Sequence, residues 1–125
     1  MTGLKEKTAL VTGASSGIGL ATAQMLSTAG VRVIGCARRL DRLQAKMDAL
    51  PGPALAMELD VADATAVAGL PGRLPQDWQA VDILVNNAGS DVGGRQPFHQ
   101  GDINQWAGTI QTNVTGLMRV TAALL

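Results

Sequence analysis

The sequence has 125 residues, enough for one domain, and its 46% hydrophobic and 16% charged residues are ordinary for a chain that forms a core. Ten basic residues balance ten acidic ones, so no net charge favours nucleic acid or an anionic membrane surface, and a small-molecule partner is expected. The N-terminus has no apolar signal segment, and no apolar run approaches the roughly 18 residues of a membrane span. We therefore expect a cytoplasmic protein.

Short apolar runs alternate with stretches of helical periodicity along the chain. This pattern predicts an α/β fold in which helices cover a parallel sheet. An amphipathic helix is expected after each of the first two strands, and the second helix should end before Pro51. The expected strands are residues 8–12, 31–37, 54–59 and 81–85.

The crossover between the third and fourth strands, residues 63–80, carries mixed signals. Asp63 is a candidate cap for a helix through Leu70. Pro71 and Gly72 then break the helical pattern, so we expect an irregular segment here.

The end of the chain is expected to be a loop followed by a helix. Residues 90–102 are rich in glycine and polar side chains, which favours a loop. Apolar side chains in residues 103–125 recur at i, i+3, i+4 and i+7, which predicts one long amphipathic helix. No glycine or cap follows this helix, although a natural domain end would normally show one.

Cysteine and histidine are scarce. Cys36 is the only cysteine and lies in an apolar run, so a buried thiol in a reducing compartment is expected. His99 is the only histidine, and no spacing of Cys, His, Asp and Glu resembles a metal site. We therefore predict no metal, and a solvated His99.

A glycine-rich loop joins the first strand to its helix. A helix N-terminus carries unpaired backbone N–H groups and a partial positive charge, so it can bind an anion. Gly13 fits a tight turn, Gly17 leaves room for a pyrophosphate, and Gly19 allows close packing of the helix on the sheet. The alternative is a turn that simply needs positive φ angles. The candidate cofactor-binding residues here are Gly13, Ser15, Ser16, Gly17, Ile18 and Gly19.

Three residues separate the first two glycines of this loop, and one separates the last two. Together with Asn86-Asn87-Ala88-Gly89 after the fourth strand, this spacing resembles the short-chain dehydrogenase/reductase family of the classical kind. The resemblance covers nearly the whole chain. It implies a Rossmann-like, doubly wound parallel sheet, incomplete here, with strands in the order 3-2-1-4. It also implies that the Thr12 hydroxyl ties the first strand to the fourth near Ala88.

The resemblance assigns further residues to the two ends of a dinucleotide. Asp60 and Val61 match the pair that contacts the adenine ring, although Asp60 could instead cap a helix or turn. The second motif, from Asn86 onward, would line the nicotinamide ribose side and lock the centre of the sheet. Its candidate cofactor-binding residues are Asn87, Ala88 and Gly89.

The end of the second strand indicates which cofactor is used. An NAD enzyme places an acidic residue there, whereas this chain continues with Arg38 and Arg39, which favours the 2′-phosphate of NADP. We favour Arg38 as the phosphate ligand, and the alternative for either arginine is a solvated cation near Asp41. Many NADP members of the family carry a basic residue where this chain has Ser16, so NAD stays possible.

Of the family's catalytic residues, only Asn113 has a match in this chain. It lies within the last predicted helix, where asparagine has poor propensity, and an exposed polar residue is the alternative. The family's Tyr-x-x-x-Lys pair is missing, because the sequence has no tyrosine and its last lysine is Lys46. We therefore expect residues 1–125 to be the NADP-binding half of a truncated enzyme, inactive alone.

The resemblance implies that the whole protein is an oxidoreductase that transfers a hydride between a nicotinamide cofactor and a small alcohol or carbonyl compound. It also implies a homo-oligomer assembled through the last helix. Two alternatives stay open. One is a non-catalytic NADP-binding module, and the other is a structural remnant that pairs with another polypeptide.

Overall fold

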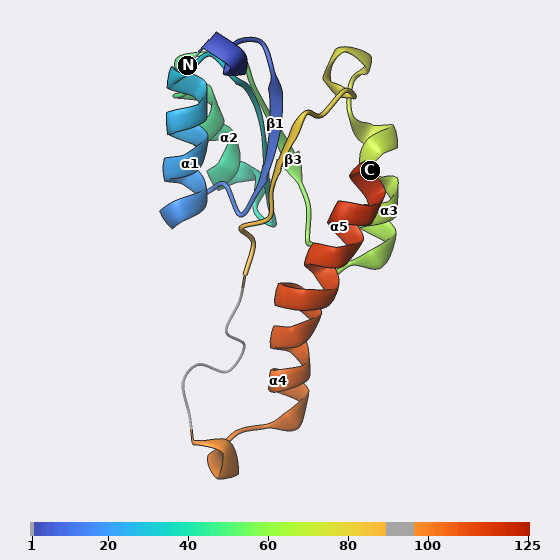
Figure 1. Ribbon diagram of the computed structural model, residues 1–125. Helices are drawn as coiled ribbons and strands as arrows, with labels where there is room; N and C mark the ends of the chain where they lie inside the picture. Colours follow the sequence, from blue (N-terminus) through green and yellow to red (C-terminus); the bar gives the residue numbers. More distant parts are fainter. Residues whose placement is uncertain (1, 90–96) are drawn as a thin grey trace.

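The computed structural model describes residues 2–89 and 97–125. Their strands form a four-stranded parallel sheet in the order β3-β2-β1-β4, which confirms the predicted order (Figure 1). Leu10 at the centre of β1 lies opposite Ile34 on one side and Leu84 on the other. The strands are β1 (Thr8–Thr12), β2 (Arg32–Ala37), β3 (Ala54–Glu58) and β4 (Ile83–Val85).

Helices cover both faces of this sheet (Figure 1). Helices α1 (Gly17–Thr28) and α2 (Leu40–Asp48) lie on one face. Helices α3 (Ala64–Arg73) and α5 (Leu117–Leu124) pack side by side on the other. Helix α4 (Ile103–Ile110) leads into α5 and extends beyond the sheet. Short 3-10 turns occur at Thr2–Leu4, Gln76–Trp78 and Phe98–Gln100.

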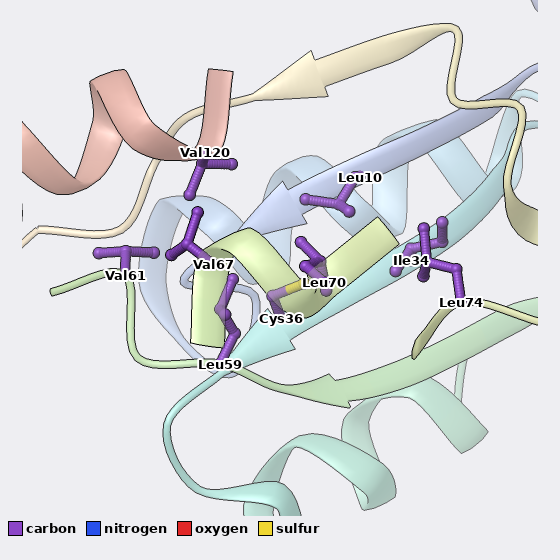
Figure 2. Packing of buried hydrophobic residues seen from close by; sticks show 9 residues of the cluster. All are labelled: Leu10, Ile34, Cys36, Leu59, Val61, Val67, Leu70, Leu74 and Val120. Carbon is purple, nitrogen blue, oxygen red and sulfur yellow. The ribbon is translucent and has the colours of Figure 1, made fainter. Parts of the chain in front are cut away.

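Side chains from alternate strand positions fill two cores, one on each face of the sheet. All five residues of β1 are buried, as expected for a strand covered on both faces. Leu10 and Ile34 pack against α3 and α5, where they meet Leu70 and Val120 (Figure 2). The other core holds Val11 and Val33 of the sheet with Ala23, Leu43 and Met47 of α1 and α2.

The predicted irregular crossover was partly wrong, because α3 continues through Pro71 to Arg73. The predicted cap is confirmed, since the Asp63 carboxylate accepts a hydrogen bond from the backbone N–H of Ala66 at 3.1 Å. Leu70 and Leu74 are both buried on the sheet, and this packing holds the helix together across the proline. Only the last turn follows Pro71, so the lost backbone hydrogen bond affects little of the helix.

The single long helix predicted for residues 103–125 is divided by a π-helical segment, Gln111–Gly116. A π-helix pairs residues five apart and occurs mostly as a single turn inside α-helices. Gly116 at its end lies against the chain after β3, because an added Cβ would stand 2.6 Å from the Val61 carbonyl oxygen. Within residues 2–89 and 97–125, no helix has both the length and the apolar character needed to cross a membrane.

Candidate functional site

A pocket of about 240 Å³ lies at the carboxyl ends of the strands. It opens beside the point where the chain order of the sheet reverses, between β1 and β4. Ligands of doubly wound sheets bind at this position. The pocket is lined by Thr12, Gly13, Ser15, Ser16, Cys36, Ala37, Arg38, Leu59, Asp60, Val61, Asn87, Ala88, Gly89 and Thr112.

Thr12 joins the two central strands at the floor of this pocket. Its hydroxyl oxygen accepts hydrogen bonds from the backbone N–H groups of Asn87 and Ala88, each at 3.0 Å. The same hydroxyl donates to the Val85 carbonyl oxygen at 3.5 Å. The tie predicted for Thr12 is therefore confirmed, and it fixes the chain after β4 against the end of β1.

The glycine loop is held against the same segment. The Asn87 side-chain amide donates to the Gly13 carbonyl oxygen at 3.2 Å, and Gly13 itself has a φ of 66°. Gly19 brings α1 against this turn, since a Cβ there would overlap the Gly13 carbonyl oxygen and the Asn87 amide nitrogen. The predicted close approach of the helix at Gly19 is confirmed.

Gly17, the first residue of α1, leaves the helix N-terminus open. Its φ of 58° favours glycine, and a Cβ built there would meet no atom within 4 Å. Ser16 before it makes no side-chain hydrogen bond to the first turn of the helix. The backbone N–H groups of this turn are thus accessible to an anion.

The two arginines after β2 lie differently. Arg38 lines the pocket, whereas Arg39 does not. The guanidinium of Arg39 lies 3.5 Å from the Asp41 carboxylate, with 61% of the Arg39 side chain exposed. The backbone hydrogen bond from Arg42 lowers the pKa of Asp41, and the charge of Arg39 contributes to the same shift. The structure therefore brings only Arg38 to the site.

Asp60 and Val61 form the wall after β3. Asp60 is exposed, and its carboxylate accepts a hydrogen bond from the backbone N–H of Ala62 at 2.9 Å. The turn-capping role considered for Asp60 is thus present, and the residue also lines the pocket. Val61 is buried and belongs to the same core as Leu59. Leu59 also lines the pocket, and the sequence did not predict it there.

The four residues of the Asn86–Gly89 motif do not all lie at the pocket. The Asn86 side-chain amide donates to the Thr121 hydroxyl at 3.0 Å, so this side chain ties β4 to α5 and lies outside the pocket lining. Asn87, Ala88 and Gly89 all line the pocket. These are the three residues of the motif that the sequence offered as candidates for binding the cofactor.

Asn113 lies next to this motif without lining the pocket. A Cβ added to Gly89 would stand 3.3 Å from the Asn113 side-chain oxygen. Its neighbour in the π-helical segment, Thr112, does line the pocket and was missed by sequence reasoning. Thr112 falls off the apolar stripe of the predicted helix, so the sequence carried no signal for it. Gly17, Ile18 and Gly19 also lie outside the lining, and Ile18 is 79% exposed.

Cys36 and Ala37 complete the pocket where β2 ends. The Cys36 side chain is buried, as the sequence predicted, and this burial raises the pKa of the thiol to about 12 although the charge of Arg73 lowers it. Burial thus favours the protonated thiol, which is typical of a structural cysteine. Both residues directly precede Arg38, so the rule that ligands bind at strand ends could have found them.

Residues 7–125 match the family model for short chain dehydrogenases. The chain is also 43% identical over 122 residues to a probable NADP-dependent dehydrogenase of Haemophilus influenzae, a match that covers 98% of the chain and 48% of that protein. The chain belongs to the short chain dehydrogenase family. Its relatives in this family include an NADP-dependent 3-hydroxy acid dehydrogenase, YdfG, of Salmonella typhi, which is 40% identical over 93% of the chain and 46% of the relative.

The family's solved structures share the fold. The closed form of a serine dehydrogenase complexed with NADP+ superposes with a TM-score of 0.87 at 37% identity. That match covers 94% of this chain and 47% of the other. The chain thus spans about half the length of each of these short chain dehydrogenases.

Proposed function

We propose that this chain is the cofactor-binding part of an NADP-dependent short-chain oxidoreductase. The observation that carries the proposal is Arg38, which lines the pocket directly after β2, where an acidic residue would select NAD. A guanidinium there can form charge-assisted hydrogen bonds with the 2′-phosphate of NADP. The NADP-dependent relatives support the same choice.

The residues around the pocket fit the parts of this dinucleotide. The open helix N-terminus at Gly17 would hold the pyrophosphate, together with Ser15 and Ser16. Asp60 and Val61 would hold the adenine, and the remaining wall, Asn87–Gly89, would face the nicotinamide ribose. When bound, the cofactor supplies a hydride donor or acceptor.

We propose a small alcohol, or the corresponding carbonyl compound, as the substrate of the whole protein. Two relatives are named for 3-hydroxy acids and for serine, which is itself a 3-hydroxy acid. Asn113 is the catalytic-motif residue that this chain would contribute, and its position beside Gly89 supports that role. We expect the family's tyrosine and lysine to be supplied from outside these 125 residues.

A non-catalytic NADP-binding module is the second candidate. These 125 residues form the pocket and contain no tyrosine, so this candidate would apply if no tyrosine for proton transfer is supplied from elsewhere. Turnover of NADPH by the native protein with carbonyl compounds would distinguish the enzyme from the module.

A cytoplasmic location stays a prediction from the sequence.

The Arg38→Ala variant should bind adenosine 2′,5′-bisphosphate about 10- to 100-fold more weakly than the parent chain, because charge-assisted hydrogen bonds contribute roughly 1.5–3 kcal/mol. Its affinity for 5′-ADP, which lacks the 2′-phosphate, should change little. The matched control is Arg39→Ala, which should leave both affinities unchanged because Arg39 lies outside the pocket. Titration calorimetry measures the affinities of the parent chain and both variants for the two ligands. Equal losses for the two arginine variants would contradict the proposed cofactor.

We also propose that the intact protein assembles through α4 and α5. One face of these helices exposes large apolar side chains to solvent, which is typical of interaction surfaces. Sedimentation velocity should show an oligomer that a Met118→Glu variant weakens, and a monomer at all concentrations would contradict the assembly. The exposed side chains are Ile103, Ile110, Val114, Leu117 and Met118.

A further inference from the structure

The π-helical segment Gln111–Gly116 contacts two walls of the pocket. At one end, a Cβ on Gly116 would stand 3.0 Å from the Val61 side chain. Nearer its start, Asn113 lies beside Gly89, which follows β4. The segment therefore bridges the loops that follow β3 and β4.

Thr112 is the member of this segment that lines the pocket. Residues four or five apart in a π-helical segment stand about one turn apart, so Thr112 lies one turn from Gly116, the residue in contact with Val61. Thr112 is half-buried. This position places it at the Val61 wall, where the proposed function locates the adenosine part of the dinucleotide.

The Thr112 hydroxyl, like those of Thr65 and Thr115, makes no hydrogen bond to its own helix, whereas the hydroxyls of other helical threonines do. The hydroxyls of Thr22, Thr28 and Thr121 each donate to the carbonyl oxygen four residues earlier, at 2.8, 2.9 and 2.8 Å. The Thr112 hydroxyl has no hydrogen-bond partner among residues 2–89 and 97–125. A hydroxyl can donate and accept, so this group can pair with a ring nitrogen or a ribose hydroxyl.

We propose that the Thr112 hydroxyl hydrogen-bonds the adenosine part of the cofactor and that the π-helical segment is what places it there. The inference rests on the proposed function and adds a binding residue to it. Thr112 would thus contribute to affinity for the adenosine moiety, independently of the contact between Arg38 and the 2′-phosphate.

The experiment compares variants that keep or remove the hydroxyl, with adenosine 2′,5′-bisphosphate as the probe in titration calorimetry. Thr112→Val removes the hydroxyl at similar volume and should weaken binding about 3- to 10-fold, the usual effect of one neutral hydrogen bond. Thr112→Ser keeps the hydroxyl and should bind within about twofold of the parent chain. Thr115→Val makes the same chemical change in the same segment, outside the pocket lining, and should also bind like the parent.

Two results would overturn the role of the hydroxyl. One is a Thr112→Val variant that binds as tightly as the parent, and the other is a Thr112→Ser variant that loses as much affinity as Thr112→Val. Thermal unfolding of each variant separates a loss of affinity from a loss of fold. A parent chain that fails to bind the probe would instead contradict the proposed function, so the two failures are distinguishable.

Discussion

A Gly19→Ala variant should lose about 2–4 kcal/mol of unfolding free energy, because overpacking a rigid site typically costs about 1–3 kcal/mol and occasionally more. The added Cβ would overlap the carbonyl oxygen of Gly13, which is backbone, and the Asn87 amide nitrogen. Neither atom can move freely, since the Asn87 amide donates to that same carbonyl and Thr12 holds the Asn87 backbone. Urea denaturation followed by circular dichroism measures the loss.

Gly69 provides the matched control for this substitution. It lies within α3, and a Cβ there would meet nothing within 4 Å. Gly69→Ala should therefore raise stability by about 0.5–1 kcal/mol, the usual preference for alanine in a helix. If Gly19→Ala were as stable as the Gly69→Ala variant, the close packing of α1 on the strand ends would be wrong.

The second large effect is expected for Thr12→Val. This change removes the acceptor of two backbone N–H groups, those of Asn87 and Ala88, in a part-buried site. Each unsatisfied buried group costs about 1–3 kcal/mol, so a total loss of about 2–4 kcal/mol is expected. Binding of the dinucleotide should weaken as well, because the wall formed by Asn87, Ala88 and Gly89 would no longer be fixed.

Thr12→Ser separates the hydroxyl from the methyl group. Serine keeps the acceptor, so this variant should retain most of the stability that Thr12→Val loses. The comparison uses the same urea denaturation. A valine variant as stable as the serine variant would show that the hydroxyl does not hold the two strands together.

The sheet was predictable because each strand is a short apolar run and the glycine motif fixes the family resemblance. Two contacts at the end of β1 were also predictable from the motif. These are the hydrogen bond between the Thr12 hydroxyl and the Ala88 backbone and the close packing of α1 at Gly19. The continuation of α3 through Pro71 was not, because local propensity says nothing about the burial of Leu70 and Leu74 on the sheet. Tertiary packing decided that segment.

The candidate site was predictable where it depends on strand ends and was missed where it depends on the course of the last helix. Of the two consecutive arginines, the favoured one, Arg38, lines the pocket, while Arg39 pairs with Asp41, as the alternative for either arginine allowed. Thr112 was missed because a π-helical segment changes which residues face the sheet, and no apolar pattern marks such a segment. The assigned binding roles remain proposals.

The most direct test of the central claim is a titration of the isotope-labelled chain with NADP+, followed in its amide nitrogen–proton NMR spectrum. Binding of NADP+ in the pocket should shift the signals of Gly13, Ser15, Ser16, Arg38 and Val61, and those of Asn87–Gly89. The contact between Arg32 and the Trp78 ring lies at the opposite end of β2 and should not respond. Shifts confined to residues outside the pocket, or no shifts at saturating NADP+, would contradict the account.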